Sequence, residues 1–260
     1  MLKLGKVQIL GNELDRLKVD VCSLSEVRWE GQGHFTTLQG HTVAYSGNEK
    51  QGQHGVAVWM HKRATGTMTG YEPICERIIS VRLNAKQRKI TLVQVYAPTT
   101  AATEVETEHF YEQLSRTLRN VNKGGMTFVI GDFNAKLGSD VSLSTGSFGL
   151  GITNEAGERL KDFCIEHELM AANTFFKQHP RWLYKWMSPD GQFRNQTDYS
   201  WSTLEIMYGI SNCKTYPGAN CDSDHNLLVA SIKIQFNFQR KNMLAKKLNL
   251  EELHGHVAAE

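Results

Sequence analysis

The sequence lacks the features that mark membrane proteins, secreted proteins and zinc ribbons. None of its apolar stretches is long enough to cross a bilayer, and residues 1–6 contain no apolar segment of the kind found in signal peptides. Its five cysteines are scattered, odd in number and without the Cys-x-x-Cys spacing typical of zinc sites. The formal net charge is only +2, so no overall field favours a polyanionic partner. We expect an intracellular protein with reduced thiols and no membrane segment.

Composition and periodicity indicate one α/β domain. Of the 260 residues, 40% are hydrophobic and 22% are charged, which is usual for a globular protein. Apolar residues recur at strand spacing in some segments and at helix spacing in others. Strands are expected at 19–24, 41–45, 55–60, 77–83, 89–96, 126–130 and 226–234, and helices at 5–18, 103–121 and 154–168. We expect a domain over residues 1–236, followed at 237–260 by a basic, polar, weakly anchored helical tail.

The most informative segment is Gly131-Asp132-Phe133-Asn134, which follows the apolar run at 126–130. An acid and an amide two residues apart on a strand point to the same side of the sheet. At a strand end of a layered α/β protein they can hold a water, a metal ion or a phosphate between them. The alternative is an ordinary Asx turn, in which Asn134 bonds its own backbone.

Other strand ends carry polar side chains of the same kind. These are Glu26, Tyr96, Asp198, and Asp224 with its neighbour His225. Each of them alone is more often structural, but carboxylates that converge repel one another unless a cation neutralises them. Mg²⁺ fits such an oxygen-rich set, and no Cys/His cluster offers a softer zinc site. A metal, a carboxylate that orients water and a histidine that stabilises charge together indicate phosphodiester hydrolysis.

These segments occur in the order found in the endonuclease/exonuclease/phosphatase superfamily, which the chain resembles over about residues 1–236. The matching segments are Ser25-Glu26-Val27-Arg28-Trp29, Tyr96-Ala97-Pro98-Thr99, Gly131-Asp132-Phe133-Asn134, Asn195–Tyr199 and Ser223-Asp224-His225. The stretch Trp-Met-Ser-Pro-Asp-Gly at 186–191 is similar to that of LINE-type (non-LTR) retrotransposon endonuclease domains. Among host proteins, the chain resembles those of the craniofacial development protein 2 type.

The resemblance implies an α/β fold of the deoxyribonuclease I kind, a four-layer sandwich of two β-sheets flanked by helices. It implies nicking of DNA in the nucleus with Mg²⁺, or Mn²⁺, and no organic cofactor. By position, the implied catalytic residues are Asp132, Asn134, His225, Asp198 and Tyr96, the metal ligands Glu26 and Asp224, and the substrate contacts Lys185 and Trp186. Asp132 would orient or deprotonate the attacking water. His225, oriented by Asp198, would stabilise the phosphate in the transition state.

The chain also departs from the family pattern. Members usually begin with a strand that carries a metal-site Asn just before the helix at 5–18, so this strand and this ligand are expected to be absent, which would impair activity. Lys185 stands where the retrotransposon branch usually has Thr, and Tyr-Ser-Trp-Ser at 199–202 predicts a weakened strand. Two alternatives stay open: an inactive remnant that binds DNA or protein, and a phosphatase or phospholipase, against which the 186–191 stretch argues.

Overall fold

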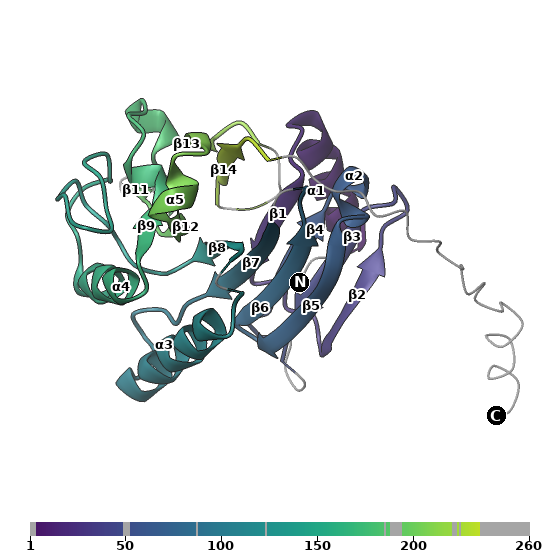
Figure 1. Ribbon diagram of the computed structural model, residues 1–260, viewed down its shortest axis with the longest axis horizontal. Helices are drawn as coiled ribbons and strands as arrows, with labels where there is room; N and C mark the ends of the chain where they lie inside the picture. Colours follow the sequence, from purple (N-terminus) through teal and green to yellow (C-terminus); the bar gives the residue numbers. More distant parts are fainter. Residues whose placement is uncertain are drawn as a thin grey trace, which may run out of the picture.

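Two β-sheets stacked face to face form the centre of the fold (Figure 1). The structure, a computed structural model, describes residues 4–48, 53–86, 88–122, 124–184, 186–187, 194–219, 223 and 225–234. Sheet A has the strand order β1 (Val21–Ser25), β4 (Val56–Met60), β3 (Thr42–Ser46) and β2 (Gln32–Thr36). Sheet B has the order β5 (Met68–Cys75), β6 (Ile78–Asn84), β7 (Lys89–Tyr96), β8 (Met126–Asp132), β12 (Asp198–Thr203) and β9 (Leu169–Ala171).

Shorter elements complete the described part of the chain. Two antiparallel pairs join β10 (Trp186–Met187) to β11 (Arg194–Asn195) and β13 (Ile210–Tyr216) to β14 (Leu227–Ile232). The helices are α1 (Leu4–Arg16), α2 (Lys62–Thr65), α3 (Glu104–Arg119), α4 (Glu155–Glu166) and α5 (Leu204–Met207), with the 3₁₀ turns η1 (Ala172–Thr174) and η2 (Pro180–Trp182). None of these helices is both long enough and apolar enough to span a membrane.

Helices cover the outer faces of both sheets, which gives four layers (Figure 1). Between the sheets, Val58 of sheet A packs in one buried cluster with Leu92 of sheet B. Val93, the next residue of β7, faces the opposite side and belongs to the cluster that includes Phe110 of α3 and Leu160 of α4. Because β7 is buried on both faces, apolar residues occupy both of them and do not alternate with polar ones, although the buried Gln94 interrupts the run. The expected four-layer α/β sandwich is confirmed.

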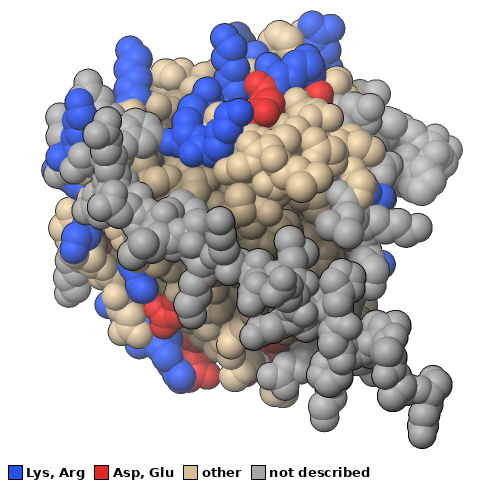
Figure 2. Space-filling view, turned by 90° about the vertical axis from the view of Figure 1, so that its right-hand side faces the viewer, with Lys and Arg blue, Asp and Glu red and all other residues tan. Residues whose placement is uncertain are grey.

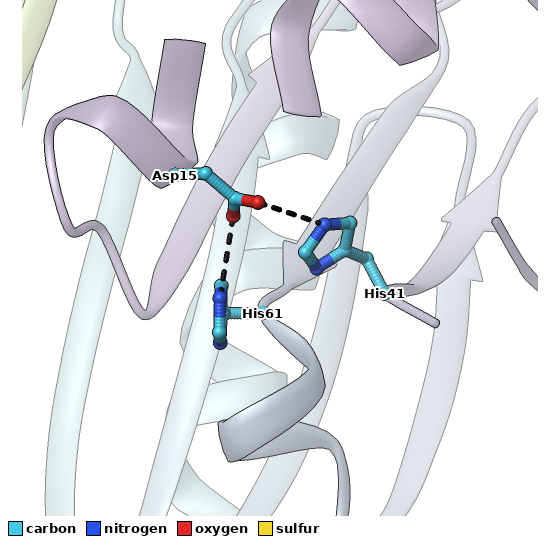
Figure 3. A group of neighbouring side chains, drawn as sticks. All are labelled: Asp15, His41 and His61. Atoms are coloured by element: carbon cyan, nitrogen blue, oxygen red, sulfur yellow. Dashed lines mark ion pairs between the residues drawn. The ribbon is translucent and has the colours of Figure 1, made fainter. Parts of the chain in front are cut away.

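A carboxylate and two imidazoles hold α1 on sheet A (Figure 3). The Nε2 atoms of His41 and His61 lie 3.5 and 3.3 Å from the carboxylate oxygens of Asp15. The Nδ1 atoms of these two rings accept the backbone N–H groups of Lys62 and Arg63 at 3.2 and 3.0 Å. A neutral imidazole whose Nδ1 accepts a hydrogen bond carries its proton on Nε2. Both rings therefore present an N–H to Asp15, and we call this group the Asp15 clamp.

The helix expected at 103–121 forms as α3, and its predicted capping box is present. Thr103 accepts the backbone N–H of Glu106 through its side chain at 3.3 Å, and its own backbone N–H donates to the Glu106 carboxylate at 2.8 Å. Two N–H groups that would otherwise lack partners in the first turn are thus satisfied.

One expected strand differs from its prediction. Residues 199–202 form the interior of β12, which pairs with β8 on one side and with β9 on the other. The strand is not weakened in its pairing, because Tyr199 and Trp201 point into the core under α3 and α4 with exposed fractions of 1% and 0%. The polar residues of this strand do leave one buried hydroxyl without a partner: among the described residues, Ser202 Oγ makes no hydrogen bond.

Candidate active site

Three polar side chains lie in register across neighbouring strands of sheet B. Tyr96 pairs with Asp132 in the parallel ladder of β7 and β8. Asp132 in turn pairs with Asp198, the first residue of the antiparallel strand β12. Residues directly opposite one another in a ladder point to the same face of the sheet. The pairing of two separate ladders therefore places a phenol and two carboxylates side by side at one edge.

His225, just before β14, completes this row. Its Nδ1 lies 3.1 Å from an oxygen of Asp198, whose side chain is only 5% exposed. One side-chain atom each from Asp132, Asp198 and His225 falls within 4.8 Å of the others. The carboxylate–imidazole contact expected between Asp198 and His225 is thus present. It fixes Nδ1 against the carboxylate and leaves Nε2 as the ring nitrogen that would act on a substrate.

Glu26 reaches the same site from sheet A. It follows β1 with a backbone φ of 55°, and its carboxylate accepts the Tyr96 hydroxyl at 2.8 Å. A guanidinium nitrogen of Arg28 lies 2.9 Å from the other Glu26 oxygen. Two residues before Tyr96 on β7, the fully buried Gln94 donates to the Leu24 carbonyl of β1 at 3.3 Å. The two sheets are therefore joined by polar contacts directly beside the site.

These contacts shift the pKa values of Glu26 and Tyr96. Burial alone would raise the pKa of Glu26, but the hydrogen bonds from Tyr96 and Arg28, with the charges of Arg28 and His225, hold it below its usual value. Burial raises the pKa of Tyr96, and its hydrogen bond to Glu26 and the charges of Glu26 and Asp132 raise it further. At neutral pH, Glu26 is therefore an anion and Tyr96 a neutral hydroxyl donor.

The Gly131–Asn134 segment has a backbone that its residue types explain. Gly131 has a φ of 146°, and a Cβ there would lie 1.9 Å from the Val95 carbonyl oxygen of β7. Asp132 Oδ1 accepts the backbone N–H of Asn134 at 2.9 Å, so the turn is closed by Asp132 rather than by Asn134. The Asn134 amide donates to the Ala97 carbonyl at 2.8 Å. Asn134 thus braces the strand ends that carry Tyr96 and Asp132.

Two residues that the sequence did not single out lie behind Tyr96. The Arg77 guanidinium lies 5.3 Å from the Tyr96 ring centre and donates to the Tyr96 carbonyl at 3.3 Å. The His54 ring nitrogen Nε2 lies 3.2 Å from Arg77, and burial followed by the Arg77 charge lowers the His54 pKa. The signal in the sequence was slight: Arg77 opens the strand expected at 77–83, and His54 directly precedes the strand expected at 55–60.

Some expected site residues are not described. Lys185 and Asp224 lie outside the described residues, as does Cys221. Trp186 begins the short strand β10, but only its backbone is described. The four described cysteines, Cys22, Cys75, Cys164 and Cys213, are free thiols.

The donor atoms of the site suit a hard divalent cation. Asp132 and Asp198, which are 5% and 4% exposed, bring two carboxylates together beside His225, and Glu26 adds a third through the Tyr96 hydroxyl. Carboxylates packed out of water repel one another, and a divalent cation removes that repulsion. The Asp15 clamp contrasts with this set, because both of its Nδ1 atoms accept backbone N–H groups. A metal-bound imidazole donates from its second nitrogen, so the clamp is a structural contact and not a metal site.

Comparison with known proteins agrees with this geometry. The model of the endonuclease/exonuclease/phosphatase family matches residues 4–225. The chain is 41% identical over 232 residues to craniofacial development protein 2 of Tragulus javanicus, covering 89% of this chain and 40% of that protein. It is 39% identical over 249 residues to the Bos taurus protein of that name, covering 95% and 42%. The chain thus spans about two fifths of the length of these relatives.

Solved structures share the fold at low sequence identity. The endonuclease domain of TRAS1, a telomere-specific non-LTR retrotransposon, has a TM-score of 0.64 at 18% identity, with 88% of this chain and 93% of that chain covered. The catalytic domain of Xenopus laevis APE2 has a TM-score of 0.69 at 17% identity, with 91% and 90% covered. The family match extends over most of the sequence, through every described residue of the site. The chain belongs to the endonuclease/exonuclease/phosphatase family.

Proposed function

We propose that this chain hydrolyses phosphodiester bonds of DNA as a Mg²⁺-dependent endonuclease, which a nuclear location would suit. The observation that supports this most strongly is the row of Tyr96, Asp132 and Asp198 across three strands, with His225 on Asp198 and Glu26 on Tyr96. An acid–imidazole pair, a second carboxylate and a metal-type carboxylate are the parts that such a hydrolysis needs. The retrotransposon endonuclease among the structural neighbours favours DNA as the substrate.

Each residue has a role that its contacts fit. Asp132, which is mostly buried at the end of β8, would orient the attacking water and take its proton. His225, held through Nδ1 by Asp198, would donate from Nε2 to the phosphate oxygen on which charge develops. The Tyr96 hydroxyl, which donates to Glu26 here and stays protonated because its pKa is raised, would turn to a phosphate oxygen once Glu26 holds the cation.

Glu26 would hold Mg²⁺, or Mn²⁺, together with a carboxylate of the buried row, and Asp224 would assist from its place beside His225. The bound cation would neutralise the charge of the phosphate and of the carboxylates. Asn134 would act by keeping the strand ends in place, since its amide contacts the Ala97 backbone. Lys185 and Trp186 would contact the DNA beyond the scissile phosphate.

A second candidate is a domain that binds DNA without cutting it. One observation favours it: Arg28 lies against Glu26, where a cation would have to bind, and competes for the same oxygen. The Arg28 and Glu26 side chains are 52% and 46% exposed, so Arg28 is able to turn away into solvent.

A plasmid-nicking assay separates the two candidates. Supercoiled plasmid is incubated with the 260-residue chain in Mg²⁺, in Mn²⁺ and in a chelator, beside the variant Asp132→Asn. Hydrolysis predicts open-circular product that requires the metal and disappears in Asp132→Asn. Plasmid that stays supercoiled while the chain retards it on a gel would support the binding domain and refute the endonuclease.

A further inference from the structure

Two cations and two aromatic rings form a cluster on the outer face of β13. The Lys214 ammonium lies 4.7 Å from the Trp182 ring centre and 5.1 Å from that of Tyr216. The Arg181 guanidinium lies 4.9 Å from the same Trp182 ring. We call these four residues the cation–aromatic strip. Contact with a ring face restrains a long basic side chain without neutralising its charge.

The strand pattern explains why the strip faces outward. Along β13, Cys213 and Thr215 are buried, whereas Lys214 and Tyr216 between and beyond them are partly exposed. Side chains two residues apart on a strand share a face, so the ammonium and the phenol lie on the side away from the core. The 3₁₀ turn η2 then places Trp182 over this face.

Among the residues that the structure describes, no acid balances the charges of the strip. Within the described part of the chain, no carboxylate forms an ion pair with Arg181 or Lys214, and both side chains lie against aromatic rings. Burying or crowding cations without an anion is unfavourable. Two cations held on the same Trp182 ring, with no described acid partner, are therefore ready for an anionic ligand.

The strip lies close to the candidate active site. In the β13–β14 ladder, Tyr216 is opposite Leu227 and Lys214 is opposite Val229. Lys214 is thus level with a residue four positions after His225, or roughly 13 Å along a strand at about 3.3 Å per residue. The side-chain amide of Asn226 donates to the Tyr184 carbonyl at 3.3 Å, which ties the η2 segment to the neighbour of His225.

The other gathering of basic residues is less suited to the DNA that reaches this site. Lys and Arg side chains collect along the top of the face in Figure 2, and α1 and α2 lie at the top right in Figure 1. Around these helices, Arg16 pairs with Glu13 and Arg63 pairs with Asp20. This region adjoins the start of β1, whereas Glu26 follows its end. Its Arg16 and Arg63 each already pair with an acid, and the region lies at the far end of sheet A from the site.

We propose that the cation–aromatic strip binds the sugar–phosphate backbone of the DNA strand, about four nucleotides from the phosphate at His225. The spacing follows from the rise of one phosphate per about 3.4 Å of helix axis in each strand. Lys214 and Arg181 each contact a phosphate, and Tyr216 offers its hydroxyl to the same backbone. The inference rests on the proposed function for the position of the DNA, but its test requires no catalysis.

The test measures DNA binding by the Asp132→Asn chain without divalent cations. A fluorescein-labelled 20-base-pair duplex is titrated at NaCl concentrations from 50 to 200 mM, and anisotropy gives the dissociation constant. Lys214→Met and Arg181→Met remove one charge each, and Lys214→Arg restores it. Lys233→Met is the matched control, because the exposed Lys233 follows the opposite end of β14. Thermal melting checks that every variant is folded.

Each strip variant is expected to flatten the log–log salt slope by about 0.9, the value for one lost phosphate contact. At 0.1 M salt this corresponds to roughly eightfold weaker binding. Lys214→Arg and Lys233→Met should keep the parent slope. If Lys214→Met and Arg181→Met fold and have the same salt slope as Lys233→Met, the strip does not bind DNA. This conclusion would hold even if the wild type nicks plasmid. If the salt slopes of the two strip variants are flatter but the wild type does not nick plasmid, the strip binds DNA and the proposed hydrolysis is refuted.

Discussion

Acidification should weaken the fold through the Asp15 clamp. The pKa values of His41 and His61 both lie below the usual 6.5. Burial is the main cause for each ring, and the charges of Lys62 for His41 and of Arg63 for His61 act in the same direction, while Asp15 opposes them. The hydrogen bonds support this direction independently. A proton on Nδ1 would displace the backbone N–H that each ring accepts.

The direction and size of the change in the free energy of unfolding with pH follow from proton linkage. Below pH 6.5 the unfolded chain binds protons on these histidines that the folded chain does not, so the free energy of unfolding falls as the pH falls. The loss continues until the pH passes the lowered pKa values of the folded state. Each ring contributes at most about 1.4 kcal/mol per pH unit, and the two together at most about 2.7 kcal/mol per pH unit.

Urea unfolding at pH 7.5, 6.5, 6.0 and 5.5 measures this slope. The double variant His41→Asn and His61→Asn keeps an acceptor near each Nδ1 position but cannot titrate, so its slope between pH 6.5 and 5.5 should be shallower by up to about 2.7 kcal/mol per unit. His34→Asn changes an exposed histidine of β2 and serves as the control. Equal slopes in wild type and double variant, or a wild type that grows more stable in acid, would refute the reasoning.

Three further changes test the packing and the site. Gly131→Ala places a Cβ 1.9 Å from the Val95 oxygen, so urea unfolding should show a loss of about 4 kcal/mol or no folded protein; a loss below about 1 kcal/mol would contradict the described backbone. Ser202→Ala removes a buried hydroxyl without a described partner and should stabilise the fold by about 1 kcal/mol; clear destabilisation would mean that the hydroxyl is bonded. Arg28→Ala should lower the Mg²⁺ concentration for half-maximal nicking, because Arg28 competes with the cation for Glu26. It should change the free energy of unfolding by less than about 0.5 kcal/mol. An unchanged metal requirement would show that Arg28 does not compete.

The sequence predicted the strands and helices whose patterns are strong. The runs at 55–60, 89–96 and 126–130 all became strands because they carry apolar residues on both faces and are largely buried between layers. It missed β5, which contains Gly70 and Pro73, residues that usually interrupt strands. These residues are tolerated because β5 is an edge strand of sheet B. It also missed β13, where a bulge between Ile210 and Asn212 breaks the alternation.

The site was predictable in its parts but not in its contacts. Asp132 and His225 could be found because each stands beside a clear strand. The hydrogen bond between Glu26 and Tyr96 joins two sheets across 70 residues of sequence, and no local pattern carries such a contact. Arg77 and Lys214 escaped notice for the same reason, since a basic residue at a strand is common and only its neighbours in space give it a role.

The most direct test of the account compares nicking by the wild type and by His225→Ala in Mg²⁺. Asp198 holds the His225 ring 3.1 Å away, beside Asp132. If His225 donates to the phosphate in the transition state, its loss should slow nicking by at least about a hundredfold, the size expected for one such donor. DNA affinity in the absence of metal should change little. A rate within about threefold of the wild type would contradict the account and remove His225 from the mechanism.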